Sequence, residues 1–231
     1  MVRHDLEVRR DLQTLLAELP VEELADLLIL QTVVLNDLCP ELDAVIIYGE
    51  TVDNEASVLL KAKELFERQK GNLTVIITAP KYPLACKHEK RYRLGLHQLG
   101  VPPGRIMAIN FPDDGIPANT YSESVQAMEW LADHNIGPKI GVIAAPFHIL
   151  RTIVSAWSAQ NKNSRSERFV FFPIPGAYLP WQEEVVHSQG VLMGTRQELV
   201  LHELMSLLRY HRKGDLISPS HALRIYNSQR G

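Results

Sequence analysis

A histidine and an arginine three positions apart, His148 and Arg151, come directly after an apolar run at residues 139–145. The run is rich in β-branched side chains and has the length of a strand covered on both faces. Pro146 suits the first position of a helix, where a residue needs no N–H donor. His148 and Arg151 would then share one face of the first turn, beside backbone N–H groups without partners. This arrangement at the end of a parallel strand predicts a site for an anion or a carbonyl oxygen.

Polar residues also follow the other predicted strands, and in a parallel sheet the strand ends meet at one edge. We expect the following residues to bind a ligand there: Gly49, Glu50 and Asn54 after the first strand, Thr78 and Lys81 after the second, and Asn119, Thr120 and Ser122 after the third. In this hypothesis Arg151 binds a phosphate or carboxylate, and His148 acts as a general acid or base. Glu89 or Glu123 would orient the histidine or take a proton.

Structural interpretations of the acidic and capping residues stay open. Asn119 or Thr120 can cap the helix that follows, with Glu123 closing a capping box. Glu89 lies near the start of a predicted helix, where a carboxylate simply stabilises the helix dipole. Both interpretations need no ligand.

The central pair has structural alternatives too. His148 can be a buried histidine that is bonded to a backbone carbonyl. Arg151 can form an ion pair with Glu50 or Glu123, and burial of that pair would require further hydrogen bonds.

Strands and helices alternate along most of the chain. We predict strands at about 43–48, 73–78, 105–110, 139–145 and 169–173, and helices at about 54–70, 87–99, 121–134, from Pro146 onward, and 195–211. Asn54 is expected to cap the first of these helices. Strands that alternate with helices of this length predict an α/β fold, with a mainly parallel sheet and helices on both faces.

The ends of the chain differ from this central pattern. Residues 1–40 predict an N-terminal extension of one or two amphipathic helices, either a cap packed on the main domain or a surface for a partner. Residues 41–215 would form the α/β domain. Residues 216–231 would be a C-terminal tail, frayed after Pro219.

Composition limits the classes of partner. The chain has 231 residues, is 45% hydrophobic and has a net charge of -3, so we expect one sizeable core and no nucleic-acid-binding surface. Two cysteines, Cys39 and Cys86, form no spaced framework, and no metal site is expected. No apolar run is long enough to span a membrane, and the N-terminus lacks the apolar core of a signal peptide. We therefore expect a cytoplasmic protein with a small-molecule ligand. The oligomeric state is left open.

Several familiar motifs are absent from the sequence. It has no G-x-G-x-x-G after the first strand, no Walker loop and no G-x-S-x-G elbow. His202-Glu203 lacks a second histidine at metal-binding spacing. Ordinary dinucleotide, nucleoside-triphosphate and α/β-hydrolase sites are therefore not predicted.

Several segments together resemble the YdcF-like or SanA-like proteins, the domain-of-unknown-function 218 family. They are the strand 44–49, Glu89, the turn Leu99-Gly100-Val101-Pro102 with Arg105-Ile106, the segment Asn119-Thr120-Tyr121, and the segment 145–151 with its His and Arg. The resemblance covers about 43–157. The sequence departs from the family at Ser122, where the family has Glu, at Thr78-Ala79-Pro80, and at Gly49-Glu50.

The resemblance implies a Rossmann-like, three-layer α/β/α fold with a cleft lined by these residues. Some members of the family have links to S-adenosylmethionine binding, and others to cell-envelope maintenance. Two hypotheses follow for this chain. It is either an enzyme acting on a small anionic or nucleotide-like metabolite, with S-adenosylmethionine as the candidate cofactor that the resemblance implies, or a non-catalytic regulatory protein linked to cell-envelope maintenance. In the second hypothesis the same residues hold a metabolite and the N-terminal helices transmit its occupancy.

Overall fold

Five short strands form one parallel sheet in the computed structural model, which describes residues 2–36, 39–79, 85–111, 119–187 and 192–230. The strands are β1 (Ala44–Ile47), β2 (Thr74–Ala79), β3 (Ile106–Asn110), β4 (Lys139–Ala144) and β5 (Val170–Pro175). Their order in the sheet is β3-β2-β1-β4-β5, and every neighbouring pair is parallel. The strand order reverses between β1 and β4, and ligands of open α/β sheets bind at such a point.

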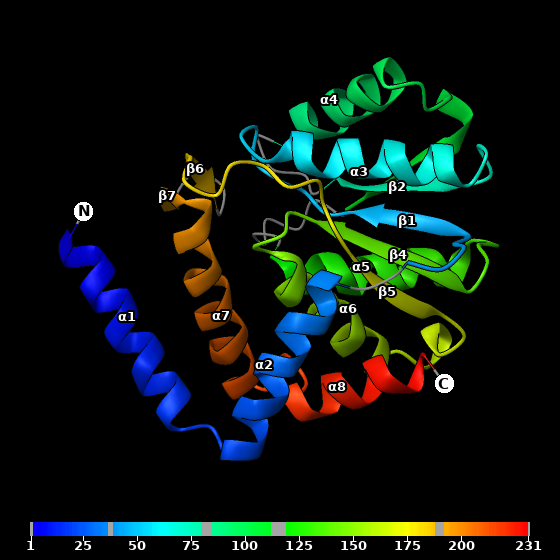
Figure 1. Cartoon of the computed structure of the whole chain (residues 1–231). Coiled ribbons are helices and arrows are strands. Elements are labelled where there is room, and N and C mark those ends of the chain that lie inside the picture. Colours follow the sequence, from blue (N-terminus) through cyan, green and yellow to red (C-terminus); the bar gives the residue numbers. More distant parts are fainter. Residues whose placement is uncertain (1, 37–38, 80–84, 112–118, 188–191, 231) are drawn as a thin grey trace.

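Helices cover both faces of the sheet (Figure 1). The helices α3 (Glu55–Arg68) and α4 (Ala85–Gln98) lie on one face, and α5 (Thr120–Asp133) and α6 (Ile149–Asn161) lie on the other. Side chains of β1 alternate between the two cores: Ala44 and Ile46 pack on the α5–α6 side, and Val45 and Ile47 pack on the α3–α4 side. The structure therefore has the three-layer α/β/α, Rossmann-like architecture that was predicted.

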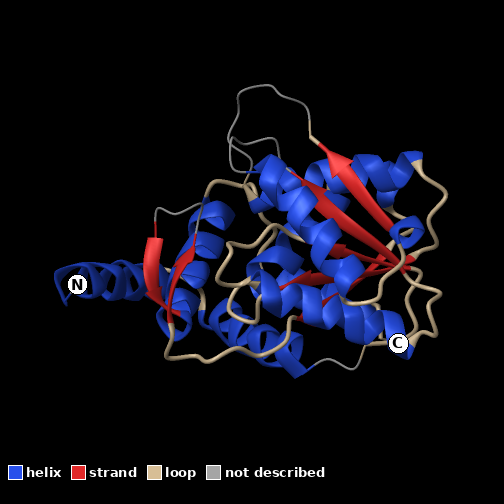
Figure 2. Ribbon diagram, turned by 90° about the horizontal axis from the view of Figure 1, so that it is seen from above, coloured by secondary structure: helices blue, strands red, loops and turns tan. Residues whose placement is uncertain are grey.

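The remaining elements pack around this unit. They are α1 (Val2–Ala17), α2 (Val21–Asn36), the hairpin β6 (Glu184–His187) with β7 (Leu192–Thr195), α7 (Arg196–Arg212) and α8 (Pro219–Ser228), and two short 3-10 turns at Pro103–Arg105 and Ser164–Ser166. Helix α1 packs on α7, and α2 packs on α8. The hairpin stands apart from the main sheet beside α7, on the side where the strands end (Figures 1 and 2).

Three local predictions were wrong. Residues after Pro219 are not frayed, because they form α8, whose Ala222 and Tyr226 are buried against the core. The hairpin was missed, because no strand was predicted after residue 173. Pro146 does not begin a helix: it lies in a turn, and α6 begins at Ile149 with His148 at the N-cap position.

The described helices include none with the length and apolar character needed to cross a bilayer.

Candidate functional site

Glu50 comes directly after β1 and is 2% exposed. Its Oε1 atom accepts hydrogen bonds from the backbone N–H of Ala145 at 2.9 Å and from Nδ1 of His148 at 3.1 Å. Its Oε2 atom is buried and has no hydrogen-bond partner among the described residues. Burying a carboxylate oxygen without a partner costs free energy. This orphan oxygen, placed between the ends of β1 and β4, is more typical of a functional site than of a packed core.

His148 is held by contacts on both ring nitrogens and is 4% exposed. Its Nε2 atom lies 3.2 Å from Nη2 of Arg151 and 3.3 Å from Oγ1 of Thr120. A guanidinium N–H can only donate, so Nε2 accepts and Nδ1 carries the proton that Glu50 binds. His148 is therefore a neutral imidazole whose unprotonated nitrogen faces Thr120 and Arg151.

Arg151 lies in the first turn of α6 and forms a two-pronged ion pair with Glu203 of α7. Its Nε and Nη2 atoms donate to the two carboxylate oxygens at 2.5 and 3.0 Å, and its Nη1 atom donates to Oγ1 of Thr120 at 2.7 Å. Burial by itself would lower the pKa of Arg151 and raise that of Glu203. The attraction between the two, with contributions to Glu203 from His148 and His187, outweighs burial, so the pKa of Arg151 is raised and that of Glu203 lies well below its ordinary value. The predicted anion anchor thus already binds a carboxylate, and that carboxylate is neither Glu50 nor Glu123.

His187, the last residue of β6, completes the cluster. Its Nε2 atom lies 2.6 Å from Oε1 of Glu203. The strand that carries it is fixed to the loop after β1: Thr51 Oγ1 donates to the Val186 carbonyl at 2.6 Å, and Asp53 Oδ2 accepts from the Val186 N–H at 2.9 Å. The hairpin therefore places an imidazole over the strand ends.

Glu123 forms the second acidic position at this edge. Burial raises the pKa of its carboxyl from 4.5 to about 7, against the opposing effects of the Thr78 hydroxyl, the Gly49 N–H and the Arg151 charge. The Thr78 hydroxyl lies 3.0 Å from Glu123 Oε2 and 3.2 Å from the Ile47 carbonyl. One hydroxyl proton cannot serve both acceptors, whereas a protonated Glu123 can donate to Thr78. The geometry thus agrees with a carboxyl that exchanges its proton near neutral pH.

Asn119 and Ser122 have a structural explanation. Asn119 Oδ1 accepts from the N–H groups of Tyr121 and Ser122, each at 3.0 Å, and Ser122 Oγ accepts from the Asn119 N–H at 2.8 Å. This is the capping box of α5, with Asn119 at the N-cap position. The prediction that Glu123 closes the box was wrong, because the helix begins at Thr120 and its third residue is Ser122.

Two further predicted residues, Asn54 and Glu89, are not among the described contacts of His148. Asn54 precedes α3 but forms no side-chain cap, because its Oδ1 atom accepts from Nε of Arg196 at 2.9 Å. Glu89 pairs with Arg93 on α4 at 2.7 Å. Lys81 lies outside the described residues. Ligand roles for these three residues stay predictions.

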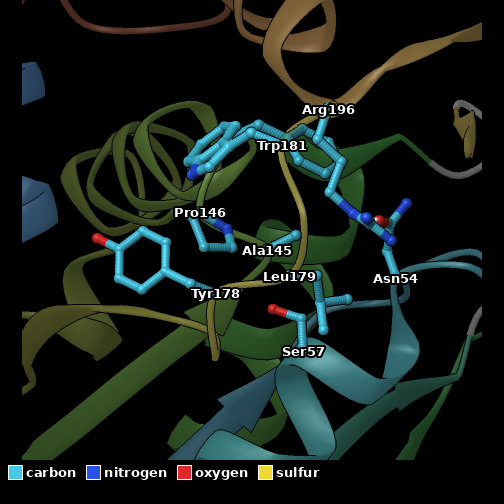
Figure 3. Close-up of a pocket in the computed structure, with 9 residues that line it drawn as sticks. Asn54, Ser57, Ala145, Pro146, Tyr178, Leu179, Trp181 and Arg196 are labelled. Atoms are coloured by element: carbon cyan, nitrogen blue, oxygen red, sulfur yellow. Dashed lines mark hydrogen bonds between the residues drawn. The ribbon is translucent and has the colours of Figure 1, made fainter. Parts of the chain in front are cut away.

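A small pocket lies beside the turn after β4. Figure 3 shows Trp181 and Arg196 on one side of it and Ser57 on the opposite side. Three of its polar side chains already have protein partners: Arg196 binds Asn54 and Glu183, and Ser57 donates to a backbone carbonyl. We therefore place the candidate site at the buried cluster of Glu50, Thr120, Glu123, His148, Arg151, His187 and Glu203.

Sequence reasoning missed Glu203 and His187. Neither residue follows a strand of the main sheet, so the rule that strand ends meet does not find them. Glu203 drew attention only as part of a metal motif, which its spacing excludes. The one available signal was the pairing requirement of a buried arginine, which does not identify the partner.

The cluster has the components of general acid–base chemistry. His148 presents a basic nitrogen next to the hydroxyl of Thr120, and Glu50 stabilises the imidazolium that forms when this nitrogen takes a proton. Glu123 and Glu203 have environments that move their pKa values in opposite directions, as in sites where one carboxyl exchanges a proton and another stays ionised. Among the described residues, no group of three or more His, Cys, Asp or Glu side chains is arranged to hold a metal ion.

No protein-family model, curated protein or solved structure matches the chain.

Proposed function

We propose that the protein is an enzyme that binds a small anionic or nucleotide-like metabolite at the carboxyl ends of β1 and β4. His148 acts as its general acid or base. One observation carries this proposal: a neutral imidazole is held between a buried carboxylate and a hydroxyl, with Glu50 on Nδ1 and Thr120 on Nε2, at the point where the strand order reverses.

The energetics of the cluster support a functional role. Burying three carboxylates, two imidazoles and a guanidinium is seldom more stabilising than an apolar core of the same size. Perturbed pKa values and an unpartnered carboxylate oxygen are features of active sites. A protein has little reason to keep such a cluster at its sheet edge for stability alone.

Each residue has a role in the proposed reaction. Glu50 fixes the tautomer of His148, and its free Oε2 atom accepts a donor group of the substrate. Glu123 gives or takes a proton, because its pKa lies near neutral pH. Arg151 binds the anionic group of the substrate. S-adenosylmethionine is one candidate ligand, on the basis of the family resemblance alone.

The test combines a ligand screen with turnover. Metabolites are screened for an increase in the melting temperature, and each hit is then incubated with the protein and followed by mass spectrometry. We expect His148→Gln to lose turnover by about 100-fold or more, since a general base typically contributes that factor. His97→Gln, a change at an exposed histidine of α4, serves as the control and should leave turnover unchanged. Equal turnover in the two variants would refute the role of His148.

A regulatory protein is the second candidate, and one observation favours it. Helix α7 carries Glu203 at the site, and near its other end Arg209 pairs with Asp11 of α1 at 2.8 Å. A ligand that moves Glu203 would therefore act on the N-terminal helices. A metabolite that stabilises the protein but is never transformed would favour this candidate over the enzyme.

A further inference from the structure

The carboxylate of Glu203 lies in a site made of donors from separate parts of the chain. Arg151 of α6 donates two hydrogen bonds to it, at 2.5 and 3.0 Å. His187 of β6 donates from Nε2 at 2.6 Å. His148 Nε2 lies 3.7 Å away and is not one of the donors, because it accepts from Arg151. The side chain of Glu203 is 5% exposed. Glu203 itself belongs to α7, which follows the hairpin and is not a helix that connects two strands of the sheet.

This set of donors is one that binds a free oxyanion. A guanidinium fork matches two oxygens of a carboxylate or phosphate, and an imidazole N–H supplies a third bond. Contacts other than Glu203 also hold these donors in position. Arg151 binds Thr120, and the strand that carries His187 is fixed by Thr51.

From this geometry we propose that Glu203 is an internal occupant of an oxyanion site, and that the carboxylate or phosphate of the ligand takes its place on Arg151 and His187. This inference rests on the proposed function and adds how the anionic group is selected. A tethered carboxylate competes at an effective concentration in about the millimolar range or above, so a simple anion displaces it only at concentrations well above that range. A ligand with further contacts displaces it at lower concentrations. Displacement would free α7 from the site.

The test measures binding of inorganic phosphate and of acetate by calorimetry at constant ionic strength. Glu203→Ala removes the competitor and empties the position of its carboxylate. We expect the variant to bind at least one of these anions with a Kd about tenfold or more below that of the wild type, because the charged donors are then unpaired. Adding Arg151→Met to this variant should abolish the gain.

A matched control comes from the same part of the chain. Glu183 forms the other arginine–carboxylate pair of this region, with Arg196, and its side chain is 55% exposed. Glu183→Ala should not increase anion affinity. If Glu203→Ala does not fold, Glu203→Gln keeps the shape of the side chain and is expected to give a smaller gain of the same sign.

Displacement is tested in the wild-type protein. Phosphate at a concentration well above the millimolar range should increase amide hydrogen exchange in α7 relative to sodium chloride at the same ionic strength, since α7 loses its contact with Arg151. Unchanged exchange, no gain in anion affinity in either Glu203 variant, or a gain that survives Arg151→Met would overturn the inference. These measurements do not depend on turnover. The oxyanion inference can therefore be refuted while the role of His148 holds, and the role of His148 can be refuted while the oxyanion inference holds.

Discussion

Polar side chains at the two ends of the parallel sheet have different kinds of partner. At the end where the strands begin, exposed side chains bind backbone groups: Asp43 Oδ2 accepts from the Lys139 N–H at 2.8 Å, and Arg168 donates to the His134 carbonyl at 3.1 Å. At the end where the strands finish, buried charged side chains bind one another, as Arg151 does with Glu203.

The difference separates polar groups with a structural role from polar groups with a functional role. Side chains at the first end bind backbone N–H and C=O groups that have no partner in the sheet. These side chains stay next to water, so this costs little free energy of desolvation. Groups at the second end are removed from water and depend on complete pairing. Changes at the second end should therefore have large effects on stability, and those at Glu123 and Glu203 should depend on pH.

The largest loss of stability is expected for a substitution in β4, a strand that runs between the two ends of the sheet. Ile143 of β4 is fully buried, and Ile143→Asp would remove its apolar contacts and bury an unpaired carboxyl group. The combined loss, about 5 kcal/mol or more, is comparable to the whole stability of a domain. Circular dichroism should show an unfolded chain. A folded Ile143→Asp protein would contradict the burial of β4, and Lys139→Ala at the exposed start of the strand is the control.

Removing one partner of the buried pair should have the next largest effect. Arg151→Met leaves Glu203 buried without its main counter-charge, which is expected to cost about 3–5 kcal/mol of unfolding free energy in urea titrations. Arg165 and Asp133 form an ion pair of the same length, 2.5 Å, with side chains about 60% exposed. Arg165→Met should cost less than about 1 kcal/mol. Similar losses in the two variants would remove the distinction between the two ends.

Two carboxyls should give pH effects of opposite sign. The folded pKa of Glu123 is raised to about 7, so its contribution is fully present below its ordinary value of 4.5 and is lost as the pH rises to 7. The folded pKa of Glu203 is lowered, so its contribution to stability is present above pH 4.5 and is lost as the pH falls below that value. In urea titrations, the free energy of unfolding of the wild type should decline by up to about 3 kcal/mol from acidic to neutral pH because of Glu123. Glu123→Gln should remove this decline. Glu203→Gln should remove stability mainly above pH 4.5. Parallel pH profiles in the two variants would contradict these assignments.

The smallest effect is expected at the cap of α5. Asn119→Ala removes the side chain that binds two free N–H groups, at a cost of about 1 kcal/mol. Ligand-induced stabilisation should persist, because Asn119 is exposed and does not contact His148 in the described structure. Loss of ligand binding in this variant would show that Asn119 has the ligand role that the sequence allowed.

The sheet could be predicted from the sequence because its strands carry a local signal. Runs such as Val45-Ile46-Ile47 are apolar on both faces, and only a covered strand accommodates them between two helices. The hairpin lacks this signal. Its strands have four residues each, and the contacts that fix Val186 come from Thr51 and Asp53, far away in the sequence.

The site was predictable to the extent that it depends on strand ends. This rule brought Glu50, Thr120, His148 and Arg151 to one edge of the sheet, and the structure places them in contact. The rule has no way to find Glu203, whose helix approaches from outside the sheet. The sequence therefore predicted a free guanidinium where the structure has an ion pair.

The separation of Arg151 and Glu203 along the chain affects how the protein is made. Arg151 is synthesised 52 residues before the carboxylate that neutralises it, and β5, the last strand of the sheet, is complete at Pro175. A nascent chain that has folded only its sheet would hold Arg151 without the carboxylate that pairs with it in the complete protein. Docking of α7 is then the step that supplies the counter-ion of Arg151 and lets the site form.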